Sequence, residues 1–480
     1  MWPNASLTNI SKMEIKRVYF IGAGGIGMAA LERYYMSRGL AVAGYDRTQS
    51  PLTRELQREG VAISYEDTVE AAVPVEFRTP DPSTLVVYTP AVPHNSRVMT
   101  FFREGGFNLV KRAKALGHIT EGSKALCFSG THGKTTTSSM AAHILHATGT
   151  GCNAFLGGIL LGYNSNLILS ANSPYSVVEA DEYDRSFHQL RPYIAVVNAT
   201  DPDHLDIYGT EEAYLESFAH FTELIRPDGY LIVHTGLKLV PRPPKGVRTY
   251  TFSRHEGDFH AENIRRGDGR ITFDFVYPGG VLRDIDLGVP VDINIDNAIA
   301  ALAACHLTGD LDMEAARQAV ASYPGVERRF QCHMRQPGPQ GKVVIDDYAH
   351  HPDEVSSSIA SVRALYPGRH LTVAFQPHLY SRTRDFAPEF AAALSMADSV
   401  VLADIYPARE EPIPGVTSQI IFDRITTADK LMICKEDFVN TMKNRNFDIL
   451  LTLGAGDLSF MVPSLCRLID PSSTISYPND

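Results

Sequence analysis

The chain has 480 residues, with 44 Lys or Arg against 55 Asp or Glu, and its formal net charge is −11 at pH 7. At about 150 residues per domain, this length indicates roughly three domains. Hydrophobic residues make up 44% and charged residues 21%, which excludes a disordered or fibrous chain. The negative balance disfavours attraction to nucleic acid or an anionic membrane through an overall positive field. We therefore expect no nucleic-acid partner and no membrane insertion.

Cysteine usage and the N-terminal segment point to a reducing compartment. The six cysteines are scattered without C-x-x-C spacing, which indicates neither a zinc knuckle nor a disulfide framework. Residues 1–16 contain no apolar run long enough for a signal peptide, and no segment approaches the roughly 18 apolar residues of a membrane span. We expect a cytoplasmic protein whose first dozen residues form a disordered tail.

The first elements form a β-α-β pattern. Residues 18–21 are a short apolar run, which predicts a strand buried on both faces of a parallel sheet. Glycine-rich residues 22–27 follow, and the next helix ends at Gly39, the place of a C-terminal glycine cap. Further strands are predicted at residues 40–45 and 85–88. This region therefore looks doubly wound.

A second strand–loop–helix start lies in the middle of the chain. Apolar residues 125–128 precede the loop G-T-H-G-K-T-T, and the following helix carries Met140, Ala141, Ile144 and Leu145 on one face. The polar stretch 117–124 predicts a linker between domains. Further strands are predicted at 175–178 and 193–197, and residues 248–280 are predicted to be a β-rich addition to the middle domain.

Pro- and Gly-rich residues near 323–325 and 336–341 precede a third set of apolar runs. These predict strands at 342–345, 371–375, 399–402 and 449–453. The expected fold class is α/β with three domains: a Rossmann-like domain at residues 1–120, a central P-loop ATPase-type domain at 121–324 and a C-terminal Rossmann-like domain at 325–480.

The strongest chemical signal is the loop at residues 130–136. Its glycines let backbone N–H groups wrap phosphate oxygens, Lys134 neutralises charge at the β- and γ-phosphates, and Thr135 can bind Mg²⁺. Phe128 stands where the common P-loop has its first glycine. The alternative interpretation of this segment is an ordinary helix start after a glycine turn. The flanking strand and helix favour a nucleoside triphosphate site, with contacts from Gly130, Thr131, His132, Gly133, Lys134, Thr135 and Thr136.

Acidic residues follow the next predicted strand. Glu179 and Asp181 lie on the same side of an extended chain and can hold the Mg²⁺ that bridges a triphosphate. The alternative is a solvated acidic turn. His204, in a later polar loop, is a candidate second metal ligand, although a lone loop histidine is more often a hydrogen-bonding residue.

The first glycine loop satisfies G-x-G-x-x-G, and Asp46 ends the next strand. Read alone, this pattern predicts a nicotinamide enzyme. The glycines only bring the backbone close to a pyrophosphate, however, so a UDP-linked substrate fits equally well. The predicted contacts are Gly22, Gly24, Gly25 and Gly27.

Two polar clusters end strands of the third domain. Residues 346–352 hold two carboxylates, a phenol and two imidazoles, and residues 376–384 offer cations that could pair with a carboxylate or phosphate. Each could also be a passive surface loop. Loops at the carboxyl ends of strands are nevertheless enriched in function.

With these motifs in order, the chain resembles the Mur ligase family, ATP-dependent amide-forming enzymes of peptidoglycan assembly. The resemblance covers nearly the whole chain. Its motifs are G-x-G-G-I-G-M, G-T-H-G-K-T-T, E-A-D-E at 179–182, D-H-x-D at 203–206, Asn294 with Asn297, Gly325 with Arg328, Arg329 and Phe330, D-Y-A-H-H-P at 347–352, Q-P-H-x-Y-S-R-T at 376–383 and Y-P-A-R-E at 406–410.

The resemblance implies an enzyme that uses ATP and Mg²⁺ to join L-alanine to UDP-N-acetylmuramate. It implies that Thr135, Glu179 and His204 bind metal and that Lys134 grips the phosphates. Further nucleotide contacts would be Asn294, Asn297, Arg328 and Asp347. His350, His378 and Arg382 would face the reacting carboxylate and the amino acid, and Lys134, His204, His350 and Arg382 would be the catalytic set.

The chain departs from the family pattern at two places. Ile293 precedes Asn294 where relatives often have His-Asn, so one base contact is in doubt. Several sister ligases use a carbamylated lysine after D-H-x-D, but residues 208–235 contain no lysine. Water or one of three carboxylates would replace it: Glu211, Glu212 or Glu216.

The nearest alternative is the recycling ligase that attaches a murein tripeptide to the same sugar nucleotide. A folate-glutamate ligase leaves the first glycine-loop domain unexplained. A nicotinamide dehydrogenase leaves the second loop unused, and a non-catalytic UDP-sugar sensor leaves Lys134, Thr135 and Glu179 without a role.

Overall fold

The computed structural model describes residues 15–471 except 94, 268, 339 and 409. The expectation of an N-terminal tail lies outside these residues. The chain forms two compact units. Unit 1 holds the described residues up to 262 together with 275–282 and 296–320, and unit 2 holds residues 263–274, 283–295 and the described residues from 321 onward.

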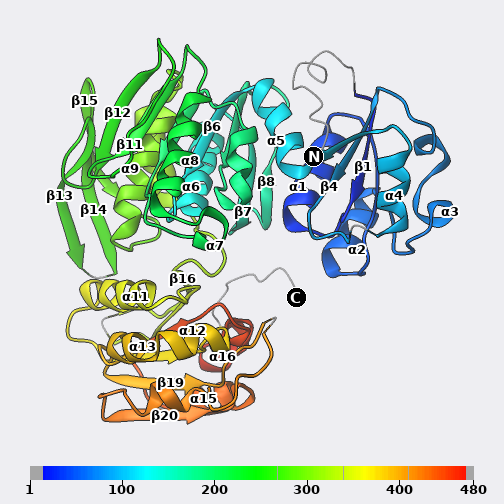
Figure 1. The fold of residues 1–480 in the computed structure, drawn as a ribbon. Helices are drawn as coiled ribbons and strands as arrows, with labels where there is room; N and C mark the ends of the chain where they lie inside the picture. The colour runs from blue at the N-terminus through cyan, green and yellow to red at the C-terminus, as the bar shows by residue number, and fades with distance from the viewer. Residues whose placement is uncertain (1–14, 94, 268, 339, 409, 472–480) are drawn as a thin grey trace. The chain divides into compact units, whose positions relative to one another are not determined.

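The first sheet is parallel throughout and has the strand order β3-β2-β1-β4-β5, which is a doubly wound arrangement (Figure 1). The predicted strands are confirmed as β1, β2 and β4, and Gly39 adopts φ 78° just beyond the first helix. Its elements are β1 (Arg17–Ile21), α1 (Ile26–Ser37), β2 (Ala41–Tyr45), α2 (Pro51–Glu59), β3 (Ala62–Ser64), α3 (Val69–Ala72), β4 (Thr84–Tyr88), α4 (Arg97–Glu104), β5 (Asn108–Lys111) and α5 (Arg112–Glu121).

The second sheet has ten strands in the order β15-β14-β13-β12-β11-β10-β6-β9-β7-β8. The β-rich segment expected at 248–280 is confirmed and supplies strands at one edge of this sheet. The elements are β6 (Lys124–Ser129), α6 (Lys134–Ala147), β7 (Asn153–Leu160), β8 (Ser165–Ile168), β9 (Tyr175–Glu179), β10 (Ile194–Val197), α7 (Leu205–Tyr208), α8 (Glu211–Glu223), β11 (Tyr230–His234), β12 (Arg248–Ser253), β13 (Phe259–Gly267), β14 (Arg270–Tyr277), β15 (Gly280–Asp286), α9 (Ile293–His306) and α10 (Met313–Ser322).

The third sheet has the order β16-β17-β21-β18-β19-β20, and only β16 is antiparallel to its neighbour. Phe438, Met442, Val462 and Leu465 of two helices pack on it with Val344 and Leu450 in one buried cluster. The elements are β16 (Gln331–Arg335), β17 (Val343–Asp347), α11 (Pro352–Leu365), β18 (Leu371–Phe375), α12 (Tyr380–Asp385), α13 (Ala387–Leu394), β19 (Ser399–Ala403), α14 (Gln419–Phe422), β20 (Asp429–Ile433), α15 (Phe438–Asn444), β21 (Ile449–Leu453) and α16 (Val462–Ile469).

Two sequence predictions are corrected here. The stretch 117–124 is not a linker, because most of it lies in α5 and β6, and a Cβ on Gly117 would stand 2.3 Å from the carbonyl oxygen of Gln189. The glycine thus serves close packing rather than flexibility. Helix α6 is buried on more than its apolar face, since Thr137, Ser138 and Ser139 are also inaccessible.

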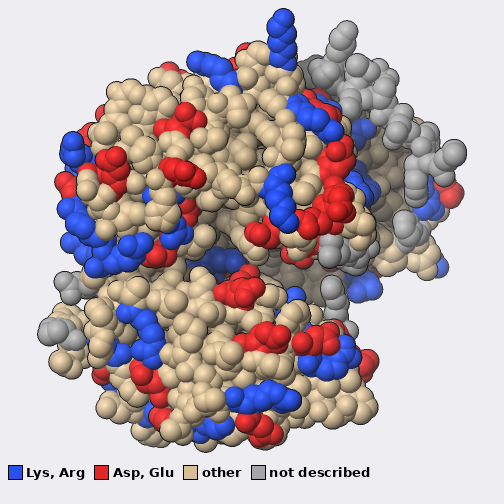
Figure 2. All heavy atoms as spheres, turned by 60° about the vertical axis from the view of Figure 1, so that its left-hand side comes forward, with Lys and Arg blue, Asp and Glu red and all other residues tan. Residues whose placement is uncertain are grey.

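Acidic and basic side chains are interspersed on the face shown in Figure 2. Arginines in and near β13–β15 are ion-paired within unit 2, namely Arg265 with Asp284, Arg266 with Asp292, Arg270 with Asp286 and Arg283 with Asp274. Among the described residues, no helix combines the length and apolarity needed to cross a bilayer.

Candidate active site

The second glycine loop joins β6 to α6, and its shape depends on two glycines. Gly130 adopts φ 133° and Gly133 adopts φ 81°, a region that side chains disfavour. A Cβ on Gly130 would lie 2.7 Å from the backbone nitrogen of Ala199, so the loop lies directly on the next strand end. Thr131 donates its backbone N–H to the Ala199 carbonyl, while His132 is exposed. The loop is held in one shape at the N-terminus of α6, where backbone N–H groups favour phosphate.

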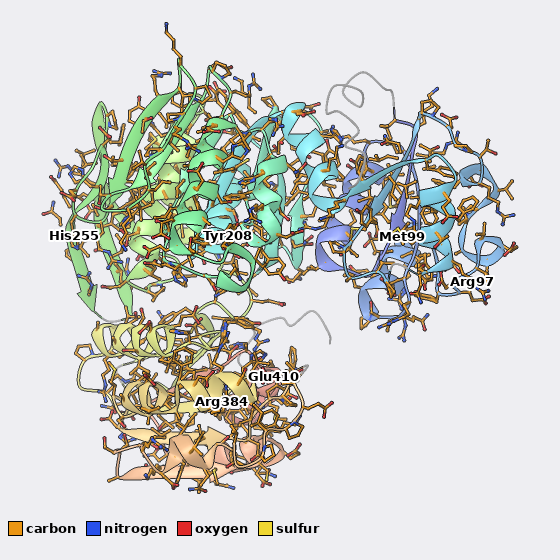
Figure 3. All side chains as sticks on the ribbon, in the orientation of Figure 1. Arg97, Met99, Tyr208, His255, Arg384 and Glu410 are labelled. Atoms are coloured by element: carbon orange, nitrogen blue, oxygen red, sulfur yellow. The ribbon has the colours of Figure 1, made fainter. Side chains whose placement is uncertain are left out.

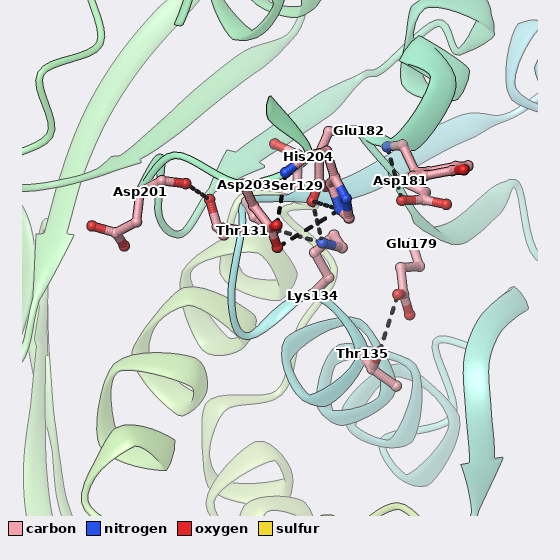
Figure 4. Close-up of polar contacts among 12 residues, drawn as sticks. Ser129, Thr131, Lys134, Thr135, Glu179, Asp181, Glu182, Asp201, Asp203 and His204 are labelled. Carbon is pink, nitrogen blue, oxygen red and sulfur yellow. Dashed lines mark hydrogen bonds and ion pairs between the residues drawn. The ribbon is translucent and has the colours of Figure 1, made fainter. Parts of the chain in front are cut away.

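Lys134, the first residue of α6, donates to two acceptors. Its Nζ donates to the Gly130 carbonyl at 2.8 Å and to Glu182 Oε1 at 2.8 Å (Figure 4). The Glu182 side chain is only 1% exposed. Burial raises its pKa, while Lys134 acts in the opposite direction. Glu182 therefore holds the ammonium at the mouth of the glycine loop.

Thr135 and Glu179 meet as the sequence predicted. The Thr135 hydroxyl donates to Glu179 Oε1 at 3.0 Å (Figure 4). The Gly157 N–H donates to Glu179 Oε2 at 3.0 Å. Burial raises the pKa of Glu179, and Lys134 and Thr135 oppose that rise. A hydroxyl and a carboxylate side by side are hard oxygen donors of the kind that Mg²⁺ prefers. Thr136 follows in the same helical turn.

His204 lies beside Glu182 and Asp203. Its Nε2 is 3.9 Å from Glu182 Oε1 and 3.8 Å from Asp203 Oδ2, and its backbone adopts φ 53°. Glu182 Oε2 is buried and has no hydrogen-bond partner among the described residues. Such an atom is costly unless a ligand or cation satisfies it. No group of three His, Cys, Asp or Glu side chains within the described ranges forms a ready metal cluster.

Asn297 of α9 reaches the glycine loop. Its Oδ1 accepts the Thr137 hydroxyl at 3.0 Å, and the same hydroxyl accepts from Asn198 Nδ2 at 2.9 Å. A Cβ on Gly133 would stand 2.6 Å from Asn297 Oδ1. Asn294, in the first turn of α9, donates to the Val289 carbonyl at 3.1 Å in the segment before that helix. Asn297 of this predicted pair contacts the helix that follows the phosphate loop.

The first glycine loop is closed by Asp46. Gly24 donates its N–H to Asp46 Oδ2 at 2.6 Å, and Thr48 donates to Oδ1 at 2.9 Å. Gly22 adopts φ 91°. In a nicotinamide enzyme an acidic residue at this place binds the ribose hydroxyls. Here both oxygens are engaged by the backbone, which disfavours the nicotinamide interpretation.

The first glycine loop and the predicted magnesium carboxylate line one cavity in unit 1. The cavity has a volume of about 310 Å³ and is lined by Gly25, Gly27, Arg112, Gly157 and Glu179, among others. A Cβ on Gly27 would stand 3.1 Å from Arg112 Nη1, so a cation adjoins the loop. A guanidinium beside backbone N–H groups suits a pyrophosphate. The cavity thus joins a diphosphate-type site to the Glu179 side of the triphosphate site.

In unit 2, Asp347 ends β17, and Arg328, in the segment before β16, reaches the carbonyls that follow β21. Asp347 accepts from the Ser358 hydroxyl and from the Phe330 N–H, the latter at 3.1 Å. Arg328 donates to the carbonyls of Gly454 and Gly456 at 2.9 and 2.8 Å. Its guanidinium also lies 4.8 Å from the centre of the Tyr348 ring. The expected nucleotide contact of Arg328 would therefore act beside an existing structural role.

His350, His378 and Arg382 gather in unit 2. The two imidazole centres are 6.1 Å apart. Burial lowers the pKa of His350, Arg382 lowers it further, and Glu354 raises it. His350 is therefore a neutral imidazole near pH 7, able to accept a proton. The predicted site residues thus form one group in unit 1 and a second in unit 2.

Sequence reasoning missed Glu182 and Arg112 as site residues. Glu182 lies in the E-A-D-E run, whose pattern favours Glu179 as the metal ligand, and its contact with Lys134 joins positions far apart in sequence. Arg112 begins α5, inside a region expected to precede a linker. Among the proposed substitutes for the carbamylated lysine, Glu211 pairs with Lys238 at 2.7 Å and Glu216 with Arg242 at 2.6 Å. Ion pairs thus occupy both carboxylates.

Comparison with known protein families matches three regions of the chain. Residues 17–124 match the Mur ligase family catalytic domain, residues 128–305 the Mur ligase middle domain, and residues 328–457 the Mur ligase glutamate ligase domain.

Individual relatives match nearly end to end. The chain is 55% identical over 458 residues to the UDP-N-acetylmuramate–L-alanine ligase of Phocaeicola vulgatus, covering 95% of this chain and 98% of that protein. It is 53% identical over 463 residues to the enzyme of the same name from Parabacteroides distasonis, covering 96% and 97%. Its fold is similar to the crystal structure of UDP-N-acetylmuramate–alanine ligase from Thermotoga maritima, with a TM-score of 0.74, 24% identity and coverage of 95% and 98%.

Proposed function

The chain belongs to the Mur ligase family, and we propose that it joins L-alanine to the lactyl carboxylate of UDP-N-acetylmuramate, converting ATP to ADP and phosphate. The names of its relatives support this choice of substrates. The observation in the structure that carries it is the shared cavity. Gly25, Gly27 and Arg112 line the same space as Glu179, so a sugar nucleotide bound by its pyrophosphate would reach the triphosphate site.

The reaction requires activation of a poor electrophile. The carboxylate of the sugar attacks the γ-phosphorus of ATP, which gives an acyl phosphate and releases ADP. The amine of L-alanine then attacks the acyl carbon, the amide forms and inorganic phosphate leaves. Lys134 opposes the negative charge that develops on the transferred phosphoryl group. For this it must exchange its contact with Glu182 for one with phosphate.

Thr135 and Glu179 fit Mg²⁺, since both present oxygen atoms beside the glycine loop. Bound there, the ion would neutralise charge between the phosphates. His204 is a further candidate ligand through its contact with Glu182. We propose no role for a carbamylated lysine.

We assign His350 as the group that takes the proton from the incoming ammonium. Its lowered pKa keeps it neutral at pH 7, and Arg382 lies close enough to contribute to that lowering. Arg382 would bind the carboxylate of the amino acid, with His378 beside it. We further propose that the enzyme acts in the cytoplasm, where ATP and the sugar nucleotide are available.

The test is phosphate release with ATP, Mg²⁺ and UDP-N-acetylmuramate, comparing L-alanine, glycine, L-serine, a murein tripeptide and no amine. Release that needs both the sugar nucleotide and L-alanine supports the proposal, with Lys134→Ala as the inactive control. Release with the tripeptide alone would identify the recycling activity instead. A folded protein that releases no phosphate with any of these combinations would refute both.

A further inference from the structure

Two loops at neighbouring strand ends of the third sheet are joined through their backbones. Tyr406, after β19, donates its N–H to the Pro377 carbonyl at 2.8 Å, and Leu379, after β18, donates to the Tyr406 carbonyl at 3.0 Å. The rings of His378 and Tyr406 stack with centres 5.8 Å apart and an interplanar angle of 19°. The loop that follows β19 therefore determines where His378 lies.

A carboxylate from the same loop holds the next helix. Glu410 Oε2 accepts the backbone N–H of Ser381 at 2.9 Å, and Oε1 accepts the Ser381 hydroxyl. Ser381 is the second residue of α12 and directly precedes Arg382. These bonds lower the pKa of Glu410 and keep it anionic at neutral pH. Arg384 lies in the same helix, and Figure 3 labels it together with Glu410. The negative charge of Glu410 contributes to raising the pKa of Arg384.

The Arg382 side chain has a hydrogen-bond donor that an anion could engage. Its Nη1 is buried and has no hydrogen-bond partner among the described residues. A buried guanidinium N–H without an acceptor is costly, and a planar carboxylate is the ligand it matches best. Leu379, just before the helix, adopts φ 69°, a conformation that is strained for a non-glycine residue. The position of Arg382 thus depends on contacts that hold a strained helix start.

We propose that Glu410 is a positioning residue, which fixes α12 through Ser381 and so directs Arg382 toward the carboxylate of the amino-acid substrate. This inference rests on the proposed function of the same site. Both oxygens of Glu410 are engaged by Ser381, so Glu410 acts through the helix and not by touching the substrate. The predicted nucleotide contacts Arg328 and Asp347 have other hydrogen-bond partners, so the effect should fall on the amino acid.

The experiment measures kcat and KM for L-alanine, ATP and UDP-N-acetylmuramate in the full chain. Glu410→Ala should raise the KM for L-alanine at least about tenfold, since small misplacements of a binding group reduce rates up to about 100-fold. The KM values for ATP and the sugar nucleotide should stay within about twofold of wild type. Glu410→Gln, which keeps an acceptor for Ser381, should recover part of the loss. The matched control is Glu411→Gln, an exposed carboxylate next in sequence.

A double-mutant cycle distinguishes positioning from general damage. If Glu410 acts through Ser381, Ser381→Ala combined with Glu410→Gln should raise the KM for L-alanine by less than the product of the two single effects. Independent, multiplying effects would overturn the inference. So would Glu410→Ala enzyme with unchanged KM for L-alanine, or a uniform loss for all three substrates. If Glu410→Ala fails to fold, the KM for L-alanine of the Glu410→Gln variant and the double-mutant cycle test the inference in its place. Wild-type protein without L-alanine-dependent phosphate release would instead refute the proposed function.

Discussion

Asp346 is a buried acid that should make the third domain less stable as pH rises. It is the fourth residue of β17, is 2% exposed, and has Oδ2 without a partner among the described residues. Burial raises its pKa from 3.8 to about 7, and Asp347 adds to the rise, whereas the Thr452 hydroxyl and Arg328 oppose it. The folded state therefore binds this proton more tightly than the unfolded state.

The sign and size of the effect follow from that pKa. The stabilisation from holding the proton is complete below the unfolded pKa near 3.8 and is lost as pH rises to about 7. Each unit corresponds to about 1.4 kcal/mol, so wild type should lose about 3 kcal/mol between pH 5 and pH 8 from this group. Asp346→Asn carries no charge at either pH. Its amide places a donor where Oδ2 has no partner, which costs about 1–3 kcal/mol at both pH values.

The assay is thermal unfolding of wild type and Asp346→Asn at pH 5 and pH 8. For a domain of this size 1 kcal/mol shifts the melting temperature by about 2–4 °C. The variant should thus melt below wild type at pH 5 and gain roughly 8 °C relative to it by pH 8. Asp423→Asn, an exposed position in the same unit, serves as the control. A difference between Asp346→Asn and wild type that does not change with pH would refute the reasoning.

Three further changes test the active site. Lys134→Met should lower kcat at least about 100-fold, because it removes a charge that stabilises the transition state. It should also lower the melting temperature, because Glu182 stays buried without its cation, and the double variant with Glu182→Gln should regain the stability but not the activity. Gly133→Ala should destabilise the protein by about 2 kcal/mol or more, because alanine disfavours φ 81° and its Cβ would lie 2.6 Å from Asn297 Oδ1. An unchanged midpoint of urea unfolding would contradict this loop geometry. With His350 as base, kcat should fall only at a pH below the ordinary titration range of an imidazole, since burial lowers the pKa of His350, and His350→Gln should reduce kcat about 100-fold and abolish that acidic limb.

The sequence by itself determined the central strands of the sheets and both glycine loops, but not shorter strands such as β3, β5 and β8. Apolar runs such as residues 18–21 and 371–375 predicted β1 and β18, because a strand buried on both faces leaves a short continuous hydrophobic pattern. The loop at 130–136 could be recognised because its glycines, lysine and threonine are consecutive and each has a local geometric reason. The contact of Thr135 with Glu179 was also predictable, since Glu179 ends β9 and Thr135 lies in the first turn of the helix that follows the neighbouring parallel strand β6.

Only the tertiary structure decided which charges meet. Glu182 could not be assigned to Lys134, nor Glu410 to Ser381, because these bonds join different elements and leave no periodic trace in the sequence. Asp346 and Asp347 look alike in the sequence, yet one faces the core beside Thr452 and the other the strand end beside Ser358. Local pattern fixes secondary structure, whereas burial and partner choice, which set each pKa and role, depend on how the sheets and helices pack.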